Sequence, residues 1–444
     1  MIQFMRSEVH IIVLIFYCLI MKGSFRLDTI KTNLKAVLDY VLAFLKWFVI
    51  ALVLGITGGL LGSSFHFCID FVTELRQENK YLLLLLPVAP VVITFLYSTF
   101  STARKITTDR VIESVRKNKN IPFVMLPLIY VGTVITHLVG GSAGREGAAL
   151  QLGGSLGYKL GKLLKLDDND MHIIVMAGMS SVFSALFGTP VTAAIFSLEV
   201  TTVGVIHYAG FVPCIISSVA AVQVAERLGL NAVKYEGVMF SDISMTVLLR
   251  VVLFAVLCAA VSILFCAAHK RCAEWFEKLI KNTYLRAFVV GSLLLLLTVA
   301  VGTSDYNGAG MHIVDSAIAG NARPEAFILK LIFTVITIAA GFKGGEIVPA
   351  FFIGSTFGCL MAPLLGLEAP FLAAMGFVAL FCCVVNCPIA SLILSVEVFG
   401  TQGFLYFAIV CGVSFMMSGR FGIYHSQKIM YSKIDDEYIN RHAI

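Results

Sequence analysis

The sequence is short of charge. Asp, Glu, Lys and Arg make up 14% of its 444 residues, whereas hydrophobic residues make up 58%. A soluble domain carries roughly a quarter charged residues. The mean hydropathy of +0.90 agrees with this deficit. A chain this apolar cannot cover a folded surface with polar groups, so a soluble globular protein is excluded and a lipid bilayer is the expected surrounding.

The sequence also lacks the spacings that mark metal sites and enzymes. Its eleven cysteines follow no disulfide or metal-binding pattern, and its nine histidines are scattered. Phosphate loops and nucleophile motifs are missing as well. We therefore expect no metal, no cofactor and no enzymatic activity. A membrane enzyme or a structural membrane protein is the least favoured class.

Long apolar runs fill most of the chain. Many approach or exceed the ~20 residues that cross a bilayer, and glycine or proline interrupts several of them. Basic residues gather near both ends and in 104–119, which predicts cytosolic termini rather than nucleic-acid binding. Residues 1–34 include a short apolar stretch that fits an interfacial helix. Residues 424–444 form a short polar tail, too small for a regulatory domain.

Two copies of one unit are visible in the sequence. GREGAALQLGGS at 144–155 matches GGEIVPAFFIGS at 344–355, at an offset of 200 residues. Segments 176–200 and 374–398 match at an offset of 198. We therefore predict two transmembrane repeats, 35–235 and 245–423, with a substrate site where they meet near the membrane midplane.

Each copy joins a glycine-rich turn to an apolar helix. The turns are GGSAGREG at 140–147 and GFKGGE at 341–346. The first amides of a helix have no intrahelical acceptor, and together with the helix dipole they attract an anion. Two such helix starts meeting in the membrane would surround a dehydrated anion with N–H donors. Alternatively, the glycines only allow helices to pack closely.

Glu146 is the sharpest candidate in this pattern. A carboxylate in an apolar membrane segment is costly and usually functional. At a helix start it could occupy the position of the anion and leave on protonation, which would make it both gate and proton carrier. The alternative is a static helix cap. Glu346 in the second turn is either a proton site or a cap, whereas the equivalent Glu199 and Glu397 fit structural capping.

These motifs resemble the CLC family of anion channels and anion/proton antiporters. GREG at 144–147 resembles the gating-glutamate motif, GGEIVPAFFIGSTFG at 344–358 the second anion-binding motif, and GIYHSQ at 422–427 the segment with the central tyrosine. The resemblance implies an all-α polytopic membrane fold of two inverted repeats and a homodimer with one pathway per subunit. It assigns gating and proton transfer to Glu146, a possible coupling role to Glu346, and anion binding to Gly144, Arg145, Gly147, Ile347, Val348 and Tyr424.

The chain departs from the chloride-transporting pattern in several places. The upstream GSGIP motif has no match in 101–116, which leaves the inner serine ligand without a counterpart. Val200 stands at the position of the internal proton glutamate. These departures resemble the bacterial fluoride/proton branch, although that branch typically has threonine where this chain has Val348. The resemblance implies a bacterial plasma membrane.

The favoured function is therefore transport of a small halide in exchange for protons, with fluoride preferred over chloride. The alternative is a passive, gated chloride channel of the same fold. The missing acid at position 200 favours the channel, and uphill anion movement driven by a proton gradient distinguishes the two.

Overall fold

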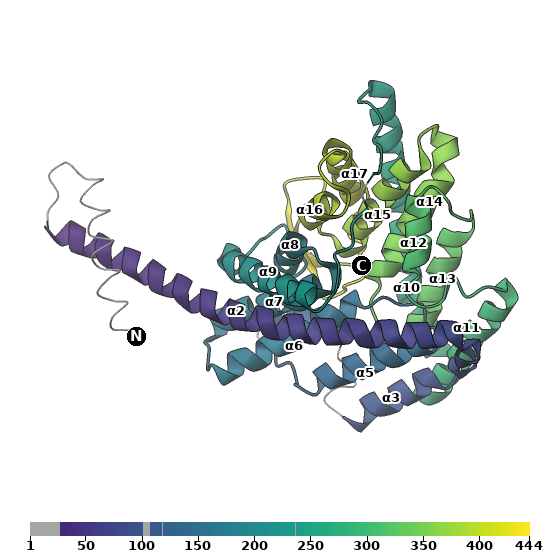
Figure 1. Cartoon of the computed structure of the whole chain (residues 1–444), viewed down its shortest axis with the longest axis horizontal. Coiled ribbons are helices and arrows are strands. Elements are labelled where there is room, and N and C mark those ends of the chain that lie inside the picture. The colour runs from purple at the N-terminus through teal and green to yellow at the C-terminus, as the bar shows by residue number, and fades with distance from the viewer. Residues whose placement is uncertain (1–26, 101–106, 118, 236) are drawn as a thin grey trace. The chain divides into compact units, whose positions relative to one another are not determined.

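The structure is a computed structural model that describes residues 27–100, 107–117, 119–235 and 237–444 (Figure 1). Residues 51–444 form one compact unit, and the site and packing described below lie within it. The unit is built almost entirely of helices, as the composition predicts. Within the described residues, six helices are long and apolar enough to cross a membrane.

Helices dominate both halves of the chain. Those of the first half are α2 (Leu27–Glu78), η1 (Lys80–Leu85), α3 (Ala89–Thr99), α4 (Thr108–Lys117), α5 (Met125–Leu138), α6 (Glu146–Leu163), α7 (Asp168–Phe187), α8 (Pro190–Glu199), η3 (Tyr208–Gly210) and α9 (Phe211–Arg227). Those of the second half are α10 (Met245–Leu279), α11 (Thr283–Val301), α12 (Met311–Ile318), α13 (Ala326–Ala339), α14 (Ile347–Leu365), α15 (Ala369–Val385), α16 (Pro388–Phe399) and α17 (Phe404–Met417).

The two halves pack in the same order. Helix α6 packs on α5 and α7, and its counterpart α14 packs on α13 and α15, which lie beside it in Figure 1. Glycines allow the closest approach in both copies, because Gly178 lies against Gly153 and Gly376 lies against Gly354. The repeated sequence segments therefore produce repeated packing, and the all-helical fold class is confirmed.

Helices α8 and α16 cap each other where the halves meet. Glu397, near the end of α16, accepts hydrogen bonds from the N–H groups of Val191 and Thr192 at 2.9 and 2.8 Å. Glu199, at the end of α8, accepts them from Ile389 and Ala390 at 3.2 and 2.8 Å. Each carboxylate thus satisfies the first amides of the opposite helix. The capping role expected for this symmetric pair is confirmed.

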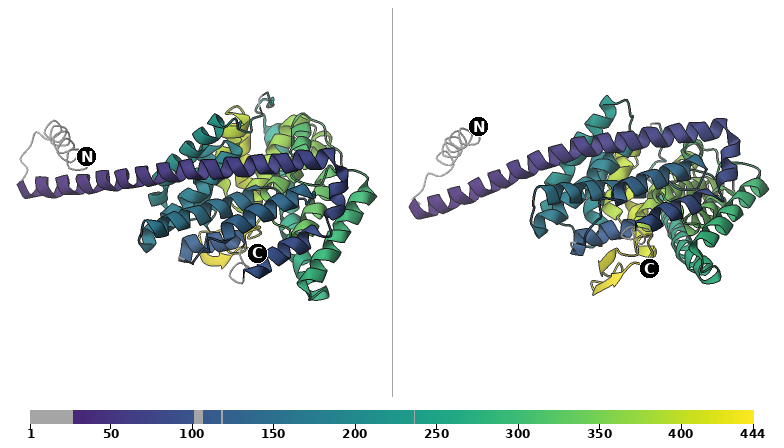
Figure 2. Two further views of the ribbon diagram at one scale, coloured as in Figure 1. Left: turned by 60° about the horizontal axis from the view of Figure 1, so that its bottom comes forward. Right: turned by 90° about the horizontal axis from the view of Figure 1, so that it is seen from below.

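The C-terminal tail departs from the helical prediction. Strands β2 (Lys428–Tyr431) and β3 (Tyr438–His442) form an antiparallel pair, and β2 also pairs in parallel with β1 (Thr202–Val203). Strands β2 and β3 are the yellow arrows near the C-terminus in Figure 2. The helix-based reading missed them because the tail is short and polar, and its pairing partner lies over 200 residues away.

At the N-terminus, the expected interfacial helix falls mainly on residues 1–26, which lie outside the described residues. The predicted boundary between residues 34 and 35 falls inside α2.

Candidate functional site

The two glycine-rich turns meet at the start of α6 and α14. Gly144 and Gly345 form an antiparallel bridge in which each N–H donates to the carbonyl of the other, both at 2.7 Å. The repeats thus come together at the motifs that the sequence singles out. The Gly144 amide already has an acceptor in this bridge, so Gly144 contributes to the site through its missing side chain rather than as a free donor.

Amides without an intrahelical acceptor lie near this bridge. Helix α6 begins at Glu146 and α14 at Ile347, so the N–H groups of Gly147, Ile347 and Val348 lie in the first turns and have no intrahelical acceptor. Any Cβ at Gly345 would overlap the Gly147 nitrogen. Glycine at position 345 therefore keeps open the space that the first α6 amides face. The comparison of motifs did not single out this glycine.

Glu146 lies within this group of donors. Its side chain is 1% exposed. The carboxylate interacts with the main-chain N–H groups of Arg145, Glu146 itself and Val348, while Oε2 has no hydrogen-bond partner among the described residues. Since Val348 belongs to the opposite repeat, the carboxylate does more than cap its own helix. It lies between the starts of the two helices.

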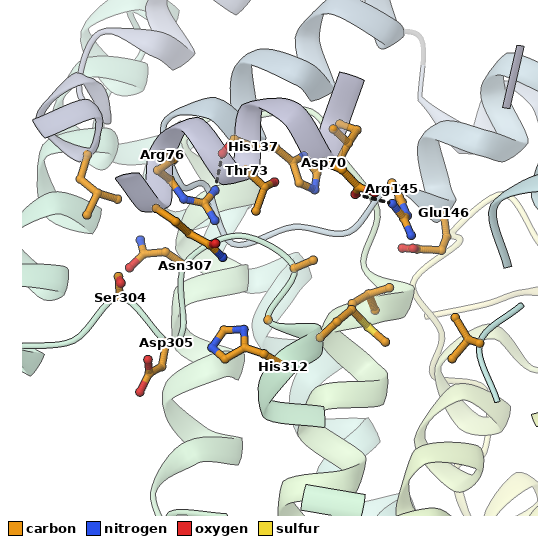
Figure 3. A pocket seen from close by; sticks show the side chains of 18 of the residues that line it. Asp70, Thr73, Arg76, His137, Arg145, Glu146, Ser304, Asp305, Asn307 and His312 are labelled. Carbon is orange, nitrogen blue, oxygen red and sulfur yellow. Dashed lines mark hydrogen bonds and ion pairs between the residues drawn. The ribbon is translucent and has the colours of Figure 1, made fainter. Parts of the chain in front are cut away.

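A cavity of about 510 Å³ leads to Glu146. We call it the vestibule; Figure 3 shows Arg145 and Glu146 side by side at one end, with His312 and Asp305 across from the α2 side chains. Arg145 Nη1 pairs with Asp70 Oδ1 at 3.1 Å, and His66 Nε2 pairs with Asp70 Oδ2 at 2.9 Å. Arg145 therefore faces the vestibule with its charge partly balanced.

The vestibule walls carry further cationic anchors. Arg76 donates to the His137 carbonyl, drawn as a dashed line in Figure 3. Fully buried Lys330 donates to the carbonyls of Tyr306 and Gly308 at 3.3 and 2.6 Å. Arg76 thus joins α2 to α5, and Lys330 joins α13 to the 304–310 loop, part of which lines the vestibule.

Tyr424 lies in the segment after α17 and is not among the residues that line the vestibule. Its side chain is 3% exposed, and its phenol oxygen has no hydrogen-bond partner in the described part of the chain. The Glu346 and Glu146 carboxylates are close enough to interact with it electrostatically. A buried, unpaired hydroxyl can donate a hydrogen bond to a ligand. The segment is held because the Ser426 N–H donates to Asp109 Oδ1 at 2.7 Å.

Glu346 precedes α14 without capping it, because its side chain makes no cap hydrogen bond within the described chain. It instead faces His269 of α10, with 3.6 Å between Oε1 and Nε2. Lys343 of the same turn is close enough to interact with it electrostatically. Of the two roles that the sequence leaves open, the geometry removes the simple cap.

The comparisons with known proteins agree with this geometry. A profile of the family described as voltage gated chloride channel matches residues 89–419. The chain belongs to this CLC family. A chloride/fluoride channel protein of Pseudomonas syringae pv. tomato is 32% identical over 403 residues, which cover 89% of each chain. An H(+)/Cl(-) exchange transporter, ClcA, of Yersinia pestis is 24% identical over 379 residues, or 79% of each chain.

Solved CLC structures share the fold. The crystal structure of a CLC-type fluoride/proton antiporter superimposes with a TM-score of 0.82 at 29% identity, covering 86% of this chain and 97% of that one. A slow cyanobacterial Cl-/H+ antiporter superimposes with a TM-score of 0.69 at 19% identity, covering 84% and 94%. The chain is therefore a membrane protein of CLC fold.

This CLC chain has a polar pair at the site that its motifs do not reveal. Gln151 Nε2 donates to Thr108 Oγ1 at 3.0 Å, and Thr108 Oγ1 donates to the Gly147 carbonyl at 3.4 Å. Thr108 opens α4, in the region where the GSGIP motif has no match. The neighbouring Asp109 holds the Tyr424 segment, so the first turn of α4 connects both sides of the site. A hydroxyl at the end of an unmatched segment was the only sequence signal.

No group of three or more His, Cys, Asp or Glu side chains in the described ranges could hold a metal ion. The described residues that converge at the site are instead N–H and O–H donors with two carboxylates, a chemistry suited to anions and protons.

Proposed function

We propose that the chain moves a small halide anion across a membrane in exchange for protons, with fluoride preferred over chloride. The observation that carries the proposal is the position of Glu146. Its carboxylate lies between the starts of α6 and α14, against amides from both repeats. A protonated Glu146 would leave those donors to an anion, which couples proton uptake to anion entry.

The remaining site residues take supporting roles in this proposal. The amides of Gly147, Ile347 and Val348 and the hydroxyl of Tyr424 bind the anion, Arg145 attracts it in the vestibule, and Gly144 makes room beside the Glu146 carboxylate. Glu346 transfers protons on the Tyr424 side. We further propose a homodimer in a bacterial plasma membrane, with both termini in the cytosol.

Two comparisons support fluoride. The relative at 32% identity carries chloride/fluoride in its name, and the structure at 29% identity is a fluoride/proton antiporter. Fluoride holds its water tightly, so a site that strips it must offer many donors. The first-turn amides of two helices and an unpaired phenol meet that requirement in one buried space.

The experiment is parallel fluoride and chloride efflux from liposomes containing the purified protein, with pH recorded in the same vesicles. We expect an outward anion gradient to drive protons inward, and a proton gradient to drive anions uphill, faster for fluoride than for chloride. Efflux of either anion without proton movement would refute the exchange. Equal or faster chloride movement would refute the preference.

One observation favours the second candidate, a passive gated channel. Val200 is buried at the position of the internal proton glutamate, and the neighbouring Glu199 is committed to capping α16. Neither side chain is free to carry protons on that route. An exchanger therefore needs another titratable group on the Tyr424 side, and uphill movement in the same vesicles decides between the two candidates.

A further inference from the structure

His269 on α10 is a half-buried imidazole whose two shielded ring nitrogens have unused hydrogen-bonding capacity. Its side chain is 14% exposed, and neither ring nitrogen makes a hydrogen bond within the residues that the structure describes. A buried polar group normally has a partner, because leaving it unpaired costs free energy. The nearest acid is Glu346, whose Oε1 lies 3.6 Å from Nε2. This spacing is one short side-chain shift away from a proton-transfer contact.

The groups around the imidazole connect the anion site with the protein surface. From other elements, Glu346 and Lys343 come from the turn before α14, and His425 lies beside Tyr424 in the segment after α17. On α10 itself, His269, Lys270 and Glu274 all lie within electrostatic range of His425.

Open pockets lie next to this group. One of about 550 Å³ is lined by Ala268 and Glu274, and another of about 390 Å³ is lined by His425. His269 thus stands between a buried acid and groups that reach water.

The first repeat presents a histidine in the equivalent place. Helix α2 is the counterpart of α10 in the element order, and His66 precedes His269 by 203 residues, close to the 200 that separate Glu146 from Glu346. His66 pairs with Asp70, which pairs with Arg145 beside Glu146. Each repeat therefore brings an imidazole from its long first helix to the turn that carries its acid.

We propose that His269 carries protons between Glu346 and the aqueous face on the Tyr424 side. The proposal rests on proton exchange as the function and fills the place left empty by Val200. An imidazolium donates its Nε2 proton to Glu346, which gives a neutral carboxylic acid and a neutral imidazole. The ring keeps its Nδ1 proton and regains one at Nε2, either from hydronium or from water, which leaves hydroxide, and the reverse sequence releases protons.

The alternative is a structural ion pair that only holds α10 against the turn. A structural pair depends on shape and charge and is not restored by a free base in solution. Proton transfer depends on a titratable group at the right place, so free imidazole diffusing into the space of a missing side chain restores it.

The test compares wild type, His269→Gln and His269→Ala in liposomes, with anion and proton fluxes recorded together. We expect coupled proton flux to fall at least about tenfold in both variants, which corresponds to about 1.4 kcal/mol of barrier. Anion binding should change little, because the first-turn amides are untouched. Imidazole added to the Tyr424 side should restore proton flux in His269→Ala and leave the proton flux of the wild-type protein unchanged. Exposed His207, changed to Gln, is the matched control.

The outcomes separate the two proposals. If the wild-type protein moves anions without protons, both the exchange function and the role of His269 are overturned. If the wild-type protein couples anion to proton movement and the His269 variants keep the same proton flux and pH profile, only the role of His269 is overturned. Loss of flux in both variants without rescue by imidazole assigns His269 a structural role and also overturns the inference.

Discussion

At the scale of single residues, Glu146 is a buried carboxyl group that contacts main-chain N–H donors. In the proposed mechanism its carboxylate takes the place of an anion among amides that belong to both repeats. A neutral side chain of the same shape would leave those amides free and could no longer bind or release a proton.

We therefore expect Glu146→Gln to abolish coupled proton movement and leave anion flux that only runs downhill. The measurement is simultaneous anion and pH recording in liposomes, with exposed Glu277→Gln as the control for the loss of one carboxylate. Proton movement that survives Glu146→Gln at the wild-type rate would remove Glu146 from the mechanism.

At the scale of elements, helices α8 and α16 depend on each other's C-terminal acids. Removing the Glu397 carboxylate leaves the Val191 and Thr192 amides at the start of α8 without acceptors. We expect Glu397→Ala to lower the free energy of unfolding by about 1 kcal/mol, with little effect on coupling. Thermal unfolding in detergent measures this, with Glu277→Ala on exposed α10 surface as control. Identical midpoints for both variants would contradict the capping role.

The loop between β2 and β3 is anchored by Lys433. Its ammonium donates to Asn386 Oδ1 at 2.6 Å, to the Phe415 carbonyl at 3.0 Å and to Ser418 Oγ at 3.0 Å. Burial lowers the pKa of Lys433 to about 8, below its ordinary value of 10.5. Between these two values the unfolded chain binds more protons than the folded one, so stability rises with pH across that window.

Lys433→Met should therefore remove this rise. We expect the unfolding temperature of the wild-type protein to rise relative to that of the variant as pH increases from 8 to about 10. The same comparison for exposed Lys281→Met should show no such trend. A constant difference between wild type and Lys433→Met over that range would show that the amine titrates alike in both states.

At the scale of the whole molecule, much of the apolar surface faces outward, as on α2, α10 and α11. Lipid and a second copy of the chain are the surroundings that suit such a surface. We expect a detergent-solubilised particle with twice the 48.2 kDa mass of one chain, as measured by light scattering after gel filtration. A protein mass of one chain that persists at high concentration would contradict the proposed homodimer.

How far the sequence predicts this molecule depends on how local each signal is. The helix starts at Glu146 and Ile347 were predicted because glycine, acid and apolar residues stand together and recur after 200 residues. His269 and Thr108 were missed because each lies alone in its helix and joins the site only through packing. The tail strands were missed for the same reason, since their pairing with Thr202 and Val203 is set by the fold.

The reciprocal hydrogen bonds between Gly144 and Gly345 join one repeat to the other beside the proposed ion path. A transporter that works by rocking its halves apart would have to break these bonds in every turnover. Because the donors proposed to hold the ion lie next to this bridge, in the first turns of α6 and α14, we expect the main chain to stay in place while the ion moves. Access to the site from the two sides of the membrane would then alternate through small movements of side chains. The rate of turnover should therefore depend on the protonation of these side chains rather than on a large rearrangement of helices.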